Sequence, residues 1–185
     1  MLYNIDMKLI LVRHGESEGN LNHILRGLDD DKLTKKGIEQ AKNVGKELKE
    51  KHKIDMVFCS PLSRCVQTLE NILDECPIDG EILMSKLIEE RDFGEYTGME
   101  AVLIDWEDIN KDNKINREMG VESLIDLKKR TDLFLEDLKL ENEDYTILVI
   151  SHTGPIKMMV NKLTGKGYED IEIKNGEILV FDELK

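Results

Sequence analysis

The sequence has few of the residues that stabilise small secreted domains or bind structural metals. Cysteine and proline each occur three times in 185 residues, and tryptophan occurs once. The cysteines, Cys59, Cys65 and Cys76, include no CxxC pair, which argues against a disulfide framework and against a zinc site. Because the length suits one compact core and no proline-rich linker divides it, we expect a single domain over residues 1–185.

Long hydrophobic runs and an excess of positive charge are also absent. No stretch approaches the length of a membrane span, and the short apolar run at residues 9–12 lacks the basic cluster and cleavage site of a signal peptide. Lys and Arg number 26 against 39 Asp and Glu, a formal net charge of −13, which repels nucleic acid and anionic lipid. We therefore expect a cytoplasmic protein whose partners include neither nucleic acid nor a membrane.

Strand and helix patterns alternate along the chain. Apolar runs rich in β-branched residues predict buried strands at residues 9–12, 56–58, 147–150 and 178–181. One-sided apolar patterns predict helices at 34–52, 61–73, 124–138 and 156–163, the second of them beginning after Ser60 at Pro61. This alternation predicts an α/β fold with a mainly parallel sheet covered by helices. The irregular stretch at about 94–121 is interpreted as a lid-like insertion, and residues 1–6 receive no role.

Residues that suit phosphate chemistry follow three of the predicted strands. Arg13 and His14 follow the first strand, Arg64 lies one helical turn past the second, and His152 follows a later one. Since ligands bind beyond the carboxyl ends of parallel strands, we expect these side chains in one crevice. Two guanidiniums can hold a phosphoryl group, and a neutral imidazole can attack phosphorus. A leaving alkoxide also needs a proton, for which Glu90 is the candidate donor.

The segments that carry these residues resemble the histidine phosphatase superfamily, which includes the cofactor-dependent phosphoglycerate mutases. In chain order they are LVRHGESEGN, SPLSRCVQT, ERDFGEYTG and SHTGPIK, and with GVES at residues 120–123 they cover nearly the whole chain. In this resemblance Arg13 and Arg64 bind the phosphate and His14 becomes phosphorylated. Glu90 is the proton donor, and His152 is the second histidine of the site.

The resemblance also implies the fold and the chemistry. It implies a three-layer α/β/α sandwich of the phosphoglycerate mutase type, a phosphohistidine intermediate, no metal and no cofactor. Asn20, Gly27 and Asp30 stand at family spacing, and Asn20 is expected to bind substrate together with the arginines and the second histidine. Thr153 replaces a common glycine, which leaves its backbone amide available to bind phosphate.

Departures from the mutase pattern favour hydrolysis. Phe93 stands where mutases usually have a tyrosine, and Ala101 where they have a substrate-binding lysine. Ile24 replaces a common arginine, for which Arg26 is a candidate substitute, and the short insertion contains no Arg-Arg pair. We therefore expect a phosphatase that hydrolyses a small phosphomonoester.

Two other functions stay open at this stage. In a mutase the insertion would have to hold the substrate and exclude water, and this one offers Lys111, Lys114 and Arg117 for that task. A non-catalytic regulator would keep the phosphate pocket without the chemistry. His23 and His52 are interpreted as ordinary surface residues. Neither the identity of the ester nor the oligomeric state follows from the sequence.

Overall fold

The computed structural model describes residues 7–141 and 145–182, so residues 1–6, to which the sequence assigns no role, lie outside it. Among the described residues, five strands form one sheet in the order β3-β2-β4-β1-β5. They are β1 (Lys8–Arg13), β2 (Met56–Cys59), β3 (Glu81–Met84), β4 (Thr146–Ser151) and β5 (Ile178–Phe181). Only β5 runs antiparallel to its neighbour, β1, so the predicted mainly parallel sheet is confirmed.

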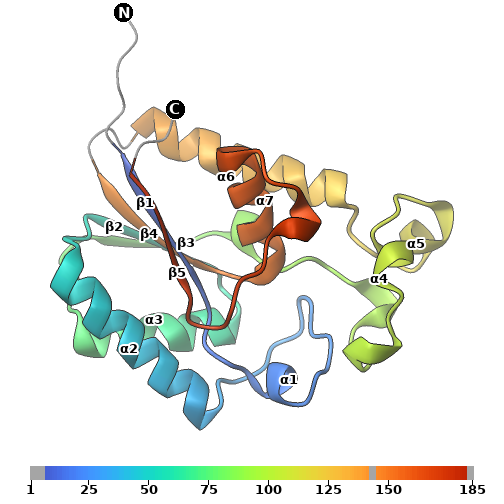
Figure 1. Ribbon diagram of the computed structural model, residues 1–185, viewed down its shortest axis with the longest axis horizontal. Helices are drawn as coiled ribbons and strands as arrows, with labels where there is room; N and C mark the ends of the chain where they lie inside the picture. The colour runs from blue at the N-terminus through green and yellow to red at the C-terminus, as the bar shows by residue number, and fades with distance from the viewer. Residues whose placement is uncertain (1–6, 142–144, 183–185) are drawn as a thin grey trace, which may run out of the picture.

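Helices follow the parallel strands along the chain (Figure 1). The long ones are α2 (Lys35–Lys51), α3 (Ser63–Glu75), α6 (Leu124–Glu141) and α7 (Thr153–Thr164), and they confirm the four predicted helices to within a few residues at each end. The short ones are α1 (Glu18–Leu21), α4 (Trp106–Ile109) and α5 (Lys114–Glu118), with 3-10 turns at Lys86–Ile88, Gly94–Tyr96, Ala101–Leu103 and Tyr168–Asp170. Among the described helices, none combines the length and apolar character that a membrane span requires.

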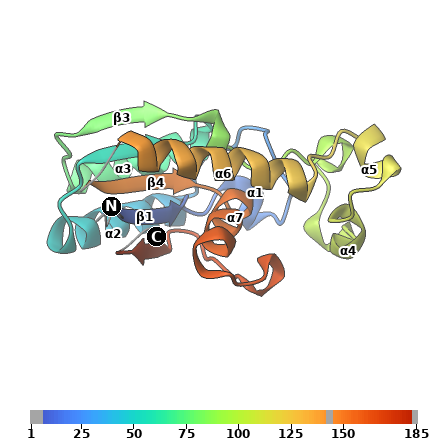
Figure 2. The same cartoon turned by 90° about the horizontal axis from the view of Figure 1, so that it is seen from above.

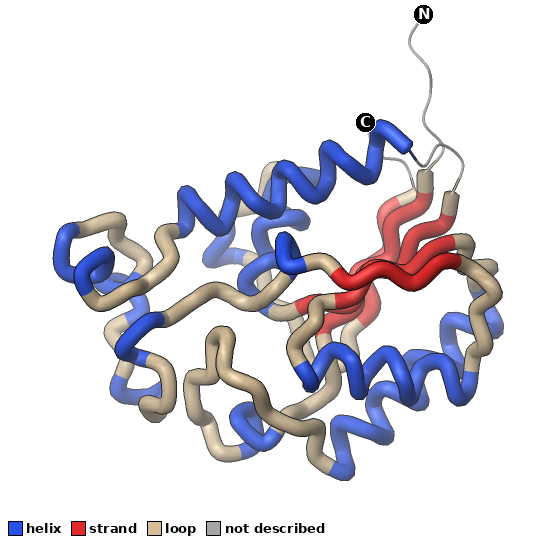
Figure 3. The backbone as a smooth tube through the Cα atoms, turned by 180° about the vertical axis from the view of Figure 1, so that it is seen from behind, coloured by secondary structure: helices blue, strands red, loops and turns tan. Residues whose placement is uncertain are grey.

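The sheet lies between two helical layers because successive buried side chains of a strand point to opposite faces. Leu9 of β1 packs in one apolar cluster with Phe134 of α6. The next residue, Ile10, belongs to a second cluster with Leu48 of α2 and Ile72 of α3. Figure 3 shows the strands between helices on both sides, which confirms the three-layer α/β/α arrangement.

Two local features differ from the sequence pattern. The edge strand β3 was not predicted because three of its four side chains are exposed and it has no buried apolar run. Its pairing with Met56–Cys59 comes from tertiary structure. Helix α3 begins at Ser63 rather than at Pro61, and the backbone N–H of Ser63 donates to Asp30 Oδ1 at 2.8 Å. The Ser63 amide is therefore not available to a ligand.

The segment at residues 94–121 lies beyond the carboxyl ends of the parallel strands. Figure 2 shows its helices α4 and α5 at the end of the molecule farthest from the two chain termini. The segment packs around a small apolar cluster, in which its Ile104, Ile109 and Val121 are buried together with the preceding residue, Phe93. It is therefore a separately packed element beside the place where the sheet presents its polar residues.

Candidate active site

His14 lies where β1 leaves the sheet, and its side chain is 3% exposed. Its backbone N–H donates to Ser151 O at 3.0 Å, and its Nδ1 lies 2.7 Å from Gly15 O. Because a carbonyl oxygen only accepts, Nδ1 carries the proton and Nε2 is the unprotonated nitrogen. Burial, followed by the charges of Arg64 and Arg13, holds the pKa of His14 well below 6.5. The ring is therefore neutral at neutral pH, with a free Nε2.

His152 lies beside His14, with their ring centroids 5.1 Å apart. It is completely buried, and its Nδ1 accepts a hydrogen bond from Arg64 Nε at 3.2 Å. Burial, followed by the charge of Arg64, holds the pKa of His152 well below 6.5. The proton of the neutral ring is then on Nε2, which lies 2.7 Å from Ser60 Oγ. His152 thus packs against the ring of His14 and accepts a hydrogen bond from Arg64.

Arg64, in the first turn of α3, holds the loop after α1 against the sheet. Its NH2 donates to Gly27 O at 2.7 Å, and its NH1 forms an ion pair with Asp31 Oδ1 at 3.2 Å. Both side chains of the pair are 3% exposed, and Asp31 Oδ2 also accepts from Gly19 N at 2.8 Å. The ion pair uses Asp31, whereas the family spacing had singled out its neighbour Asp30. Arg64 is thereby fixed before any ligand binds.

Arg13 forms no ion pair within the part of the chain that the structure describes. Its NH1 donates to Ile173 O at 2.7 Å, while its buried Nε has no hydrogen-bond partner. A partly buried guanidinium without a counterion favours an anionic ligand. Asn20 adds a second donor, because its Oδ1 already accepts from Ser17 N at 3.2 Å and from Asn175 Nδ2 at 2.9 Å. Only the Nδ2 hydrogens of Asn20 remain for a ligand.

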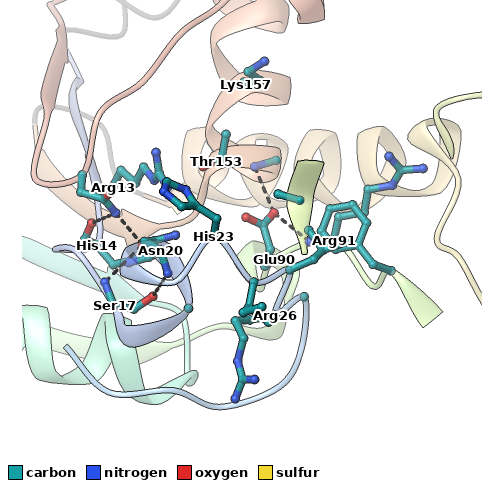
Figure 4. A pocket seen from close by; sticks show the side chains of 18 of the residues that line it. Arg13, His14, Ser17, Asn20, His23, Arg26, Glu90, Arg91, Thr153 and Lys157 are labelled. Atoms are coloured by element: carbon teal, nitrogen blue, oxygen red, sulfur yellow. Dashed lines mark hydrogen bonds between the residues drawn. The ribbon is translucent and has the colours of Figure 1, made fainter. Parts of the chain in front are cut away.

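Glu90 is anchored at the N-terminal end of α7. Its Oε1 accepts from Arg91 N at 2.9 Å and from Gly154 N at 3.0 Å, as the dashed lines in Figure 4 show. Thr153, the first residue of α7, lies next to this carboxylate. The arrangement fixes one carboxylate oxygen on backbone donors and leaves Oε2 for proton transfer.

These side chains line one cavity of about 590 Å³ (Figure 4). We name part of its lining the phosphate floor, after the ligand that the sequence predicts for it: Arg13, His14, Asn20, Arg64, Glu90 and Thr153. His152 lies beside His14 but is the one predicted site residue that does not line the cavity. The mouth of the cavity consists of His23, Phe93, Ala101, Trp106, Lys157 and Tyr168. Among the described residues, no group of three or more His, Cys, Asp or Glu is arranged to hold a metal ion.

The mouth differs from the sequence interpretation at one histidine. His23 is exposed but lines the cavity, and its φ of 56° places its backbone in the left-handed region that few non-glycine residues adopt. The interpretation of His23 as an ordinary surface residue was incomplete. Arg26, the candidate substitute for an arginine, donates to Asp30 O at 3.1 Å, and Figure 4 shows its guanidinium directed away from Glu90.

The cations of the insertion do not contribute to the mouth. Lys111 lies 3.4 Å from Glu107, and Arg117 forms a bidentate pair with Asp112 at 2.6 and 2.7 Å. Lys114 Nζ lies 3.5 Å from Glu118 Oε1, and none of the three cations lines the 590 Å³ cavity. The insertion instead contributes the largely apolar Ala101 and Trp106 to the mouth, so this segment borders the cavity.

Several residues that shape the site have no signal in the sequence. Asn175 Nδ2 donates to His14 O at 3.1 Å across 161 positions of the chain. Arg91, the residue after Glu90, is 2% exposed and donates to Glu122 O at 2.7 Å and to Asn110 Oδ1 at 2.6 Å. Its bond to Asn110 connects the insertion to the segment that carries Glu90. Only the fold brings these partners together.

The chain was compared with known protein families and with individual proteins. The family model of the histidine phosphatase superfamily (branch 1) matches residues 9–183. The chain belongs to this superfamily. It is 34% identical over 166 residues to phosphoserine phosphatase 1 of Hydrogenobacter thermophilus, with 86% of this chain and 77% of that protein covered.

Two further similarities cover most of the chain. A 2,3-bisphosphoglycerate-dependent phosphoglycerate mutase of Mesorhizobium japonicum is 33% identical over 183 residues, which covers 88% of this chain and 84% of the mutase. A crystal structure of phosphoserine phosphatase from Entamoeba histolytica, in complex with 3-phosphoglyceric acid, superimposes with a TM-score of 0.75 at 30% identity, covering 95% and 90% of the two chains. The resemblance drawn from the sequence segments is thus confirmed, and the chain is an enzyme of the phosphatase type.

Proposed function

We propose that this enzyme hydrolyses a small phosphomonoester through a phosphohistidine formed on Nε2 of His14. One observation carries the proposal: the hydrogen bond from Nδ1 to Gly15 O, at 2.7 Å, leaves Nε2 free in a buried ring whose pKa lies well below 6.5. A neutral imidazole beside two guanidiniums is a competent nucleophile for a bound phosphate ester.

In the first half of the reaction, Nε2 of His14 attacks phosphorus and the bond from phosphorus to the ester oxygen breaks. Arg13, Arg64, Asn20 and the Thr153 amide bind the phosphoryl oxygens, whose charge spreads in the transition state. Glu90 donates its proton to the departing alkoxide. His152 was expected to bind substrate, but it does not line the cavity, so we assign it a positioning role: its Nδ1 accepts a hydrogen bond from Arg64 Nε at 3.2 Å.

In the second half, the Glu90 carboxylate takes a proton from a water molecule that attacks the phosphohistidine. The bond between phosphorus and nitrogen breaks, inorganic phosphate leaves, and His14 returns to its neutral form. Glu90 finishes protonated and ready for the next ester molecule, so the cycle is balanced without any other reactant.

The relatives support both this reaction and its runner-up. The phosphoserine phosphatase similarity supports hydrolysis, and the mutase similarity supports phosphoryl transfer between phosphoglycerates as the second candidate. Hydrolysis is favoured because Phe93 and Ala101 line the mouth and the insertion adds no cation to close it over a bound acid.

The domain organisation, the location and the partners of the chain complete the proposal. We treat residues 1–185 as a single domain in which the segment at 94–121 acts as a lid-like insertion, because Ala101 and Trp106 border the cavity. A cytoplasmic location is supported by three free cysteines. The net charge of −13 supports small phosphorylated molecules, rather than nucleic acid, as partners.

The test measures inorganic phosphate release from p-nitrophenyl phosphate, phosphoserine, both monophosphoglycerates and sugar phosphates, each with and without a chelator. It compares the wild type with His14→Ala and with His52→Gln, a control on a histidine outside the cavity. We expect release by the wild type and by H52Q, and a loss of at least about a thousandfold in H14A.

A second readout locates the intermediate. Acid-labile phosphate trapped during turnover should map by mass spectrometry to His14. Phosphate on another residue, or release that persists in H14A, would contradict the mechanism. Interconversion of the phosphoglycerates without release would identify the mutase reaction, and binding without turnover of any ester would identify the regulator.

A further inference from the structure

Five cationic side chains line the cavity, and four of them have assigned tasks. They are Arg13, Arg26, Arg64, Arg91 and Lys157. Arg13 and Arg64 belong to the phosphate floor, and Arg64 is already paired with Asp31 at 3.2 Å. Arg91 is held by the oxygen acceptors described above, and Arg26 donates to Asp30 O with its guanidinium directed away from Glu90 in Figure 4. Lys157 is the cation that remains.

Lys157 is partly buried on α7, one helical turn after Thr153. Its Nζ lies over the ring of Tyr168, 5.0 Å from the ring centroid, and Tyr168 is itself buried enough to raise the pKa of its hydroxyl. A cation–π contact positions an ammonium group but leaves its hydrogen-bond donors free. Tyr168 is therefore a support for Lys157, not a counterion.

No acid within the described residues forms an ion pair with Lys157. The two acids that line the same cavity are Glu90 and Glu169. Glu90 Oε1 is held by Gly154 N at 3.0 Å, and Glu169 Oε1 accepts from Asn110 Nδ2 at 2.8 Å. In a chain with a net charge of −13, a lysine that faces a cavity without an acidic partner is available to an anionic ligand.

We propose that Lys157 binds a carboxylate of the substrate, so that the enzyme selects phosphomonoesters of short hydroxy acids. This inference rests on the proposed function, because it takes the phosphoryl group to bind on the floor at Arg13 and His14. Figure 4 shows Lys157 beyond Thr153 on the side away from Glu90, and Lys157 lines the same cavity. The substrate then spans from the floor to the mouth along α7.

The spacing fits a short carbon chain. Four helical residues rise about 6 Å along the axis, so the backbones of Thr153 and Lys157 lie about 6 Å apart along α7. That span suits an acid whose carboxylate is separated from the ester oxygen by one or two carbon atoms. A carboxylate is favoured over a second phosphoryl group, because one ammonium supplies a single charge and no bidentate fork.

The test compares esters that differ in the carboxylate alone. Phosphoserine is paired with phosphoethanolamine, and 3-phosphoglycerate is paired with glycerol 3-phosphate. Each pair is assayed for phosphate release with the wild type, Lys157→Met and Lys157→Arg. Lys162→Met is the matched control, since Lys162 lies on the same helix, outside the cavity, and pairs with Asp132 at 3.5 Å.

We expect the wild type to prefer the carboxylated member of each pair. Lys157→Met should lower kcat/KM for that member by about ten- to hundredfold, mainly through KM, and so remove the preference. Lys157→Arg should restore most of it, and Lys162→Met should behave as the wild type. Equal losses on both members of a pair, or an unchanged preference in Lys157→Met, would overturn the assignment.

Failure of the proposed function has a different signature. If p-nitrophenyl phosphate is hydrolysed in a manner that depends on His14 but Lys157→Met keeps the wild-type preference, only the role of Lys157 is wrong. If no ester is hydrolysed by the wild type, the phosphatase mechanism itself is wrong.

Discussion

The phosphate floor and the mouth of the cavity are built in different ways. On the floor, His14 and Arg64 are each 3% exposed and are held by partners from distant parts of the chain. At the mouth, Trp106 is 43% exposed, and its ring makes a T-shaped contact with Phe93, with the centroids 6.0 Å apart. The comparison predicts that a change on the buried, hydrogen-bonded floor affects the chemical step, whereas a change at the more exposed mouth affects substrate binding.

The largest effect should follow from a change to the proton donor on the floor. We expect Glu90→Gln to lower kcat by about 10²- to 10⁴-fold on alkyl phosphates, because glutamine cannot donate the proton that the alkoxide needs. The loss on p-nitrophenyl phosphate should be smaller, since its leaving group departs as a stable anion. The glutamine oxygen can still accept from Gly154 N, so the fold should persist.

Steady-state kinetics on the two ester types check this, with Glu89→Gln as the neighbouring control. Equal losses on both esters would contradict proton donation by Glu90. Such a result would reduce Glu90 to a residue that only orients the N-terminus of α7.

The buried ion pair of the floor should give the next largest effect. Asp31→Ala leaves the Arg64 guanidinium buried without its counterion, which should lower the free energy of unfolding by about 3 kcal/mol. Asp31→Asn should lose less, because its amide oxygen still accepts a hydrogen bond from Arg64.

Asp29→Ala is the matched control, because Arg64 NH1 contacts only the backbone carbonyl of Asp29, at 2.9 Å. Urea unfolding midpoints measure all three variants. If Asp31→Ala proves as stable as Asp29→Ala, the ion pair contributes nothing to the stability of the floor.

The histidines of the floor should make stability depend on pH. His14 and His152 have pKa values well below 6.5 in the folded protein, mainly because of burial. Below pH 6.5 these two histidines therefore bind more protons in the unfolded chain than in the folded one. Their contribution to the free energy of unfolding is fully present above that pH and is lost as the pH falls toward the folded pKa values. The loss reaches up to about 1.4 kcal/mol per histidine and pH unit.

Unfolding free energies measured between about pH 7 and pH 5 test this sign. His14→Asn should show a shallower decline than the wild type, whereas a change at the exposed mouth residue, His23→Gln, should leave the slope as it is. Identical slopes in the wild type and His14→Asn would mean that folding does not lower the pKa of His14.

The smallest effect should come from the mouth. Trp106→Ala removes a half-exposed ring and its contact with Phe93, so we expect a loss of about 1 kcal/mol in unfolding free energy and a raised KM, with kcat unchanged. Val102→Ala, at a side chain that is 81% exposed, is the control. A large fall in kcat for Trp106→Ala would show that the mouth also takes part in the chemical step.

The sequence was most informative where local pattern and chemistry coincide. The apolar run before Arg13 and His14 predicts a buried strand, and strand ends in a parallel sheet converge, so their meeting with Arg64 could be expected. Edge strand β3 could not be predicted, because its side chains are mostly exposed and show no apolar pattern. It is a strand because it pairs with β2 in the folded protein. The first turn of α3 was misplaced because Asp30, from a different loop, binds the Ser63 amide.

By itself, the sequence determined the α/β layering, the superfamily and the identity of the floor residues, because these depend on short-range periodicity and on ordered motifs. Only the tertiary structure decided which groups hold them: Asp31 rather than Asp30 for Arg64, and Asn175 for His14. The tertiary structure also showed that Lys157 lines the cavity without an acidic partner among the described residues. The physical reason is that a buried charge or donor is satisfied by whichever partner the fold brings within hydrogen-bond distance, regardless of separation along the chain.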